Sequence, residues 1–243
     1  MGKRSSVIRQ LAVVALVLLT TTVFAARAGG KRAGKGTQAE SAAKSANGWI
    51  SLFDGKTLDG WKANEVPESW VVKDGTIVTQ GGQRSHLFYE GPVQDHNFKN
   101  FEFKCDVMTT TGANSGLFIH TKFQPTGWPS NGYEAQVNST HGDPIRTGSL
   151  YGVKDIREPE GSSLSKDGKW FNYDITVQGK HIVFKIDGKT VMDYTEPEAV
   201  TPPKGRAGRM LSSGTFALQA HPPAKPGQAG TVCFKNIMVK PLP

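Results

Sequence analysis

The residues best suited to chemistry lie on short segments in which polar and apolar side chains alternate. In residues 133–138, Glu134, Gln136 and Asn138 fall on the side opposite the apolar residues. Because successive side chains of a β-strand point to opposite faces, such a segment presents a polar row on one face. A carboxylate beside amides can act as a general base, bind a metal ion or hold hydroxyl groups. The same pattern describes an ordinary solvated strand, so one row does not define a site.

Two further segments carry polar rows of the same kind. One places Phe118 and His120 on its outward face, and the other places Gln219 and His221 there. If the three strands are neighbours, their side chains form a polar floor that contains one phenyl ring. Amides and carboxylates satisfy the donors and acceptors of hydroxyl groups, and aromatic rings stack on the apolar faces of sugars. The combination predicts a polyhydroxylated ligand.

Loops on either side of these strands supply candidates for the rim of a site. His141 and Arg146 follow the Glu134 strand, and Trp128 lies in a Pro- and Gly-containing loop before it. The alternative for the first loop is that residues 142–144 (Gly-Asp-Pro) are a simple turn. Trp128 is a candidate sugar platform.

A conventional glycosidase needs two facing carboxylates, and the three strands offer one. Glu134 is the single carboxylate on their outward faces, and Glu102 or Asp106 is the alternative source of a second. A base, an acid and a polarising group remain available from Glu134, His221 and His120. The same side chains could also hold a divalent metal ion, so the sequence leaves the cofactor open.

The elements that must position these residues are β-strands. From Trp49 onward the chain consists of short alternating runs separated by turn signals such as Asp74-Gly75 and Asp187-Gly188. No sustained helical period interrupts them, which argues against helices that could cross between parallel strands. The clearest unit, residues 169–194, predicts a three-stranded meander. We therefore expect an all-β protein, an antiparallel two-sheet sandwich of jelly-roll character.

The first 28 residues have the parts of a secretory signal peptide. Three basic residues precede an apolar run over residues 11–24, and small residues follow. This pattern predicts cleavage after Ala25 or Ala28 and a secreted, periplasmic or cell-envelope location. No membrane association is expected after cleavage. An uncleaved leader, which would tether a structural domain to the cell envelope, is the alternative.

Residues 29–48 predict a flexible linker, and residues 49–243 a single β-sandwich domain. The formal net charge is +8, but residues 1–48 hold eight Lys and Arg and one acid, which leaves 21 Lys and Arg against 20 Asp and Glu from Trp49 onward. The predicted domain therefore lacks the basic surface that a nucleic-acid-binding protein needs. No protein partner is predicted.

The two cysteines are expected to be free. The strand phases turn Cys105 inward with Phe103 and turn Cys233 outward, beside the inward Val232 and Phe234. Side chains on opposite faces cannot form a disulfide. A bulge near residue 236 is the alternative that would change the phase.

Several motifs along the chain, in order, resemble one known family. They are "WISLFDGKTLDGW", "SGLFIHT…GYEAQV", "TGSLYGV", "KWFNYDITVQGKHIVFKIDGKTV" and "GTFALQAH…VCFKNIMVKPL". Together they resemble the 3-keto-disaccharide hydrolase family over essentially residues 49–242. The resemblance implies a concanavalin A-like jelly roll that acts on glycosides oxidised at C3, cleaving the glycosidic bond by hydrolysis or elimination.

The resemblance carries over by position to Glu134, Gln136 and His221, and the remaining candidates come from the polar rows and loops described above. Glu134, His221 and His120 are the expected catalytic residues, although relatives often have an arginine where His120 stands. The expected substrate-binding residues are Gln136, Gln219, Phe118, Trp128, His141 and Arg146. The competing hypothesis from the residues alone is a non-catalytic, lectin-like module that only holds glycan on the same floor.

Overall fold

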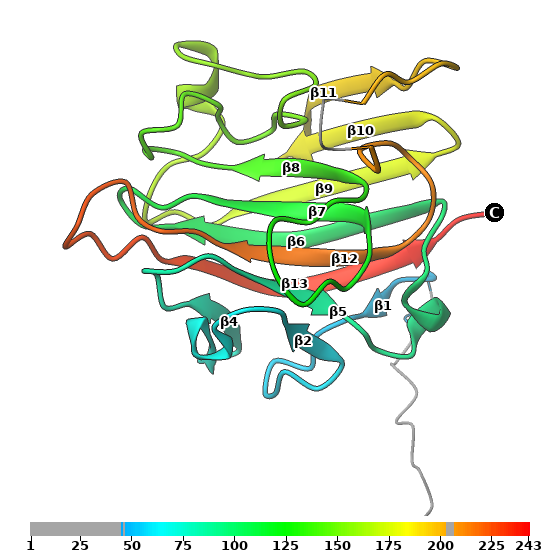
Figure 1. Ribbon diagram of the computed structural model, residues 1–243. Coiled ribbons are helices and arrows are strands. Elements are labelled where there is room, and N and C mark those ends of the chain that lie inside the picture. Colours follow the sequence, from blue (N-terminus) through cyan, green and yellow to red (C-terminus); the bar gives the residue numbers. More distant parts are fainter. Residues whose placement is uncertain (1–44, 46, 203–206) are drawn as a thin grey trace, which may run out of the picture. The chain divides into compact units, whose positions relative to one another are not determined.

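The fold is described from a computed structural model at residues 45, 47–202 and 207–243 (Figure 1). The predicted signal peptide and most of the predicted linker lie outside these residues, so both stay predictions. In the described part of the chain, no helix combines the length and apolar character needed to cross a bilayer. The expected antiparallel two-sheet sandwich is confirmed.

The first sheet has eight strands in the order β11-β10-β9-β6-β13-β4-β3, with β1 also pairing with β13. Its strands are β1 (Ile50–Ser51), β3 (Trp70–Lys73), β4 (Thr76–Thr79), β6 (Phe101–Thr109), β9 (Phe171–Gln178), β10 (His181–Ile186), β11 (Lys189–Thr195) and β13 (Val232–Pro241). The predicted meander is β9, β10 and β11, and Asp187 and Gly188 make its second turn at positive φ.

The second sheet has five strands in the order β2-β5-β12-β7-β8. Its strands are β2 (Trp61–Ala63), β5 (Ser85–Tyr89), β7 (Ser115–Thr121), β8 (Tyr133–Val137) and β12 (Thr215–Ala220). Short 3-10 turns lie between strands at η1 (Pro67–Ser69), η2 (Val93–His96) and η3 (Glu160–Ser163). The last two strands along the chain, β12 and β13, each occupy an interior position in their sheet.

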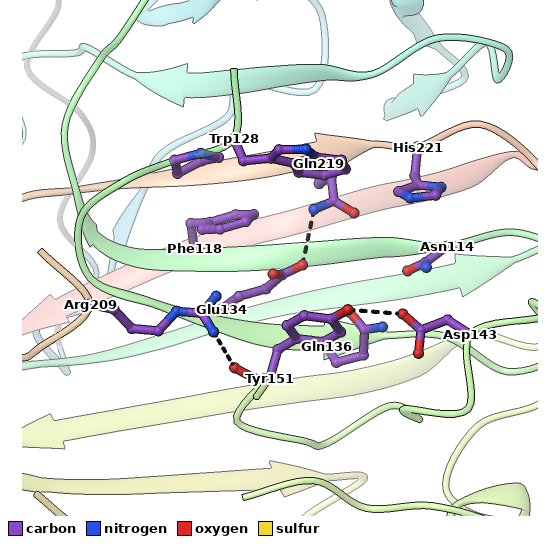
Figure 2. A pocket seen from close by; sticks show the side chains of 11 residues that line it. Asn114, Phe118, Trp128, Glu134, Gln136, Asp143, Tyr151, Arg209, Gln219 and His221 are labelled. Atoms are coloured by element: carbon purple, nitrogen blue, oxygen red, sulfur yellow. Dashed lines mark hydrogen bonds between the residues drawn. The ribbon is translucent and has the colours of Figure 1, made fainter. Parts of the chain in front are cut away.

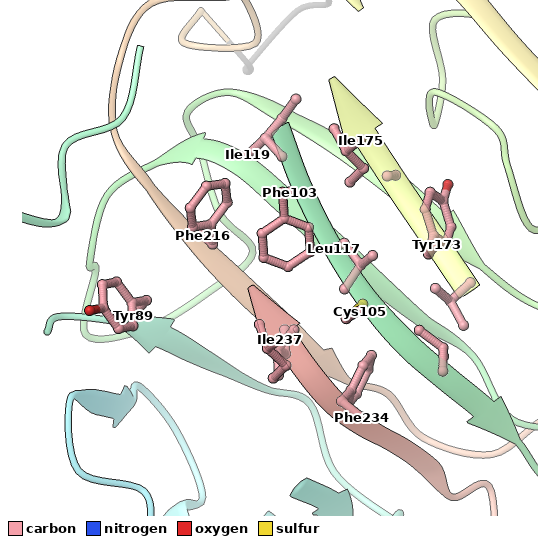
Figure 3. Packing of buried hydrophobic residues seen from close by; sticks show 14 of the residues in the cluster. Tyr89, Phe103, Cys105, Leu117, Ile119, Tyr173, Ile175, Phe216, Phe234 and Ile237 are labelled. Atoms are coloured by element: carbon pink, nitrogen blue, oxygen red, sulfur yellow. The ribbon is translucent and has the colours of Figure 1, made fainter. Parts of the chain in front are cut away.

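The hydrophobic core lies between the two sheets (Figure 3). Phe103 of β6 and Phe216 of β12 come from opposite sheets, and their ring centroids are 4.7 Å apart. Phe216 also contacts the rings of Phe98 and Phe101. Full burial of one such side chain stabilises the fold by roughly 1.5–3 kcal/mol. Interlocked rings of this kind fix how the second sheet sits on the first.

The two sheets differ in what covers their outer faces. Along β6 and β9, buried residues alternate with partly exposed ones, as expected of a sheet with one solvated face. Along β5, β7, β8 and β12, every residue is buried. Loops must therefore cover the outer face of the second sheet, and that face carries the predicted polar rows.

The cysteines are both buried and free. Cys105 lies in the core, and Val232 and Phe234 point inward as expected. The β13 register shifts between Lys235 and Met238, so the bulge lies beyond Cys233 and does not alter its phase.

Candidate functional site

A pocket of about 250 Å³ lies on the outer face of the second sheet, beneath the loops that cover it (Figure 2). Ligand pockets commonly enclose about 300–1,000 Å³, so this one suits a small ligand. Its lining residues are Asn114, Phe118, Trp128, Pro129, Glu134, Gln136, Asp143, Tyr151, Arg209, Gln219 and His221. Six of the nine predicted site residues are among them.

The floor of the pocket follows from strand register. Phe118 of β7 stands opposite Glu134 of β8, and Gly116 stands opposite Gln136. On the other side of β7, Ala217 of β12 pairs with Phe118. The polar rows that the sequence predicted on separate strands therefore lie side by side. We call Phe118, Glu134, Gln136 and Gln219 the polar floor.

Glu134 crosses the neighbouring strand to reach Gln219. The Gln219 Nε2 donates a hydrogen bond of 2.9 Å to Glu134 Oε1 (Figure 2). Gly116 lies between them on β7, and a Cβ added there would come within 2.4 Å of Glu134 Oε1. The missing side chain at residue 116 is thus what allows the carboxylate to lie across the sheet. The Glu134 residue is only 6% exposed.

The side chains of Asn138 and Arg146 hold the loop after β8 in place through hydrogen bonds. Arg146 Nη1 donates to Asn138 Oδ1 and to the carbonyl oxygens of His141 and Asp143, at 2.8–3.1 Å. Its Nε donates to Glu158 Oε1 at 2.7 Å. Arg146 does not line the pocket. The sequence predicted that Arg146 binds substrate. In the structure, Arg146 instead fixes the loop that contains His141 and places Asp143 in the pocket wall.

Two histidines form one end of the site. The rings of His141 and His221 are 5.1 Å apart between centroids. His141 Nδ1 accepts the Asp143 N–H at 3.0 Å, and burial, followed by the charge of His221, lowers the His141 pKa. His221 Nδ1 donates to the carbonyl oxygen of Pro222 at 2.7 Å. With Nδ1 donating to this carbonyl oxygen, Nε2 is the ring nitrogen that can exchange a proton with a ligand.

His120 lies away from the pocket. Its φ is +54°, and the pairing of β7 with β12 shifts register at this point. The bulge adds a residue to β7, so the alternation that predicted an outward side chain does not hold here. The imidazole packs on the Phe101 ring, with Nε2 2.9 Å from the Lys99 carbonyl oxygen and Nδ1 accepting the Ser212 N–H. Burial lowers the His120 pKa.

The pocket also contains residues that the sequence pattern did not single out as binding residues. Arg209 is buried, and its Nη1 donates to the Tyr151 carbonyl oxygen at 2.7 Å. The Tyr151 hydroxyl donates to Asp143 Oδ2 at 3.1 Å. Asn114 is 4% exposed and its Oδ1 has no hydrogen-bond partner in the described residues. These residues lie outside the strands or at their ends, where no periodicity marks them.

The chain matches a known protein family over most of its length. Residues 48–240 match the family described as the 3-keto-alpha-glucoside-1,2-lyase-like domain. The chain belongs to this family. The match covers all of both sheets except the last residue of β13, so every residue that lines the pocket lies within the 3-keto-alpha-glucoside-1,2-lyase-like domain.

Individual relatives of this family member are similar to it over a short stretch or at low sequence identity. A protein of Bacteroides thetaiotaomicron named 3-keto-disaccharide hydrolase is 38% identical over 80 residues, which are 30% of this chain and 27% of that protein. The chain thus matches about a quarter of the length of this curated relative. A crystal structure of a presumed glycosyl hydrolase from Parabacteroides distasonis superposes with a TM-score of 0.66 and 22% identity, covering 82% of this chain and 95% of that one.

A second structural neighbour is the carbohydrate binding module CBM66 from Bacillus subtilis. Its TM-score is 0.50 at 13% identity, and the alignment covers 74% of this chain and 95% of that one. At these identities the structural likenesses show the fold alone, and they agree with the expected sandwich.

His86 of β5 lies beside the polar floor of the lyase-like domain and is fully buried. Burial lowers its pKa from 6.5 to about 3, and the nearby Arg84 charge acts in the same direction. The folded chain therefore holds His86 neutral at pH values where the unfolded chain takes up a proton. Protonation of His86 in the unfolded chain therefore lowers the free energy of unfolding as the pH falls from 6.5 toward 3.

Replacing His86 with phenylalanine should flatten the acid dependence of stability. Between pH 6.5 and about 3, the free energy of unfolding should fall more steeply with decreasing pH in the wild type than in the variant. The difference in slope should reach about 1.4 kcal/mol per pH unit, the value for one proton. Urea unfolding at a series of pH values measures both slopes. Parallel curves for the two proteins would contradict the assignment of a neutral, buried His86.

The described residues contain no group of three or more His, Cys, Asp or Glu side chains placed to hold a metal ion. The divalent metal ion that the sequence left open therefore stays a prediction.

Proposed function

We propose that the pocket binds a glycoside oxidised at C3 and cleaves its glycosidic bond by elimination, which addition of water converts into net hydrolysis. The observation that carries this proposal is the buried Glu134 carboxylate, held across Gly116 by Gln219 in a sugar-sized pocket. Family membership and the name of the Bacteroides relative support the choice of a 3-keto sugar.

The chemistry requires a base at C2 because the 3-keto group makes the C2 hydrogen acidic. Glu134 takes that proton as the C1–O bond breaks and a C1–C2 double bond forms. The departing oxygen takes a proton from His221 in its imidazolium form, through Nε2. Water then adds at C1 of the enone and gives a proton to His221 Nε2, while the Glu134 carboxylic acid returns its proton to C2, so that a 3-keto sugar and both side chains are restored. One carboxylate suffices, so the second facing carboxylate of a conventional glycosidase is not needed.

Other pocket residues hold the substrate and stabilise developing charge. The Arg209 guanidinium suits the oxygen of the 3-keto group, which gains negative charge as the C2 proton leaves. The Asn114 Oδ1, buried without a partner among the described residues, suits a sugar hydroxyl that donates to it. Phe118 supplies an aromatic face for the sugar ring.

A direct assay tests the function. The purified full chain is given a 3-keto-glucoside and the same glucoside unoxidised, each with and without a chelator. We expect release of the aglycone from the keto compound alone. A loss of activity with chelator would add a metal ion to the mechanism. Binding of the sugar without cleavage of either compound would overturn the proposal in favour of a glycan-binding module.

We also propose that the protein is exported, on the pattern of its first 28 residues. The native protein should begin after Ala25 or Ala28 when its N-terminus is sequenced. Recovery of the chain with its leader intact would contradict cleavage.

A further inference from the structure

His86 lies on β5, the strand next to β12, and extends the polar floor to that strand. In the register of β5 and β12, His86 stands opposite Gln219. The row continues through Gly116 to Gln136 on β8. This row crosses three strand spacings of about 4.8 Å each, or about 14 Å in all. That length is too great for one pyranose ring and suits two.

The His86 imidazole is surrounded by aromatic rings. Its centroid is 5.4 Å from the Phe118 ring and 5.4 Å from the Trp128 ring, and the Phe88 ring is 6.3 Å away. Neither ring nitrogen has a hydrogen-bond partner among the described residues. A neutral imidazole has one N–H donor and one acceptor, and leaving both unpaired in a buried site costs free energy. Phenylalanine would fill the same space without this cost.

Trp128 lines the pocket and its ring contacts the His86 imidazole. It is 43% exposed and also packs against His221, with ring centroids 5.6 Å apart. The tip of its loop is attached to the β2–β3 connection by two bonds of Gly127: the N–H donates to Glu65 Oε2 at 3.2 Å, and the carbonyl oxygen accepts from Asn64 Nδ2 at 3.3 Å. These two bonds are at or just beyond the usual limit of about 3.2 Å, whereas within the loop Gln124 Nε2 donates to the Trp128 carbonyl oxygen at 2.7 Å.

We propose that Trp128 is a movable cover and that His86 is a substrate-binding residue beneath it. When the indole shifts, the two imidazole nitrogens pair with hydroxyl groups of the second sugar ring, the one next to the ring held at Glu134. His86 then selects a disaccharide over a glycoside with a small aglycone. This inference rests on the proposed function of the pocket and adds a specificity residue to it.

The test compares two ligands on two proteins. The wild type and a His86→Phe variant of the full chain are assayed with a 3-keto-disaccharide and with methyl 3-keto-glucoside. Phenylalanine keeps the aromatic packing and removes both nitrogens. We expect KM for the disaccharide to rise at least tenfold, KM for the methyl glycoside to change less than twofold, and the melting temperature to stay the same or increase. His181→Phe, on the exposed side of the other sheet, is the matched control and should change neither KM.

Equal KM values in wild type and variant for both ligands, or an equal rise for both, would overturn the role of His86 and leave the proposed function standing. If neither compound is turned over, the proposed function fails, and dissociation constants take the place of KM: a selective loss of disaccharide binding still supports the inference, and unchanged binding of both ligands overturns it.

Should His86→Phe fail to fold, the wild type gives the answer through the imidazole ¹⁵N chemical shifts of His86. These should move on addition of the disaccharide and stay in place with the methyl glycoside. Shifts unaffected by the disaccharide would overturn the inference.

Discussion

Replacing Glu134 with glutamine is expected to lower kcat on a 3-keto-glycoside by about 10³-fold, within the range that general-base catalysis supplies. Glutamine has nearly the same shape, and its side-chain oxygen can still accept the hydrogen bond from Gln219. It cannot take a proton from C2. The loss should therefore appear in kcat, while substrate affinity and the melting temperature stay close to those of the wild type.

Glu102→Gln is the matched control for this change. Glu102 lies on β6 of the other sheet, where its carboxylate is 3.5 Å from Lys240 Nζ, and it was one alternative source of a second catalytic carboxylate. We expect this variant to keep full activity. Retention of activity by Glu134→Gln would remove Glu134 from the mechanism, and inactivity of Glu102→Gln would restore the two-carboxylate hypothesis.

Gly116→Ala is expected to disable the site without unfolding the protein. The added Cβ would lie 2.4 Å from Glu134 Oε1 and 2.7 Å from its Cγ, so the side chain must leave its position over β7. A displacement of about 1 Å can reduce turnover by about 10²-fold. Stability should change little, because the carboxylate end can move and alanine restricts the unfolded chain more than glycine does.

Kinetics and thermal unfolding of Gly116→Ala, run together, separate displacement of Glu134 from loss of the fold. Gly142→Ala is the matched control, because a Cβ there meets nothing within 4 Å although the residue lies in the loop beside His141. Full activity in Gly116→Ala would show that turnover does not require Glu134 in the observed position. A large fall in melting temperature would mean that the strand itself had been disrupted.

Strand alternation predicted the floor of the site because the period of a β-strand is a local property. Glu134, Gln136 and Gln219 lie on the face that the pattern gave them, and β7, which pairs with both β8 and β12, lies between Glu134 and the Gln219 that it bonds. The pattern did not hold at His120, where a left-handed residue breaks the alternation. A bulge of this kind in a non-glycine residue leaves no clear mark in the sequence.

The walls of the pocket could not be predicted in the same way. Arg209 reaches the pocket through a bond to Tyr151, 58 residues away along the chain. Arg146, which the sequence placed at the rim, turns under its own loop because three oxygen acceptors there match its guanidinium. Such placements depend on which loops meet over the sheet, and only the assembled sandwich determines that.

The interior positions of β12 and β13 have a consequence for how this chain folds during synthesis. β12 joins β5 to β7, and β13 joins β4 to β6, so each sheet is divided into two parts until residues 215–241 arrive. Contacts between segments this far apart in sequence form slowly. A nascent chain that lacks this segment has neither sheet complete and cannot form the sandwich on the ribosome. The sandwich therefore folds as a unit only after residues 215–241 have been made.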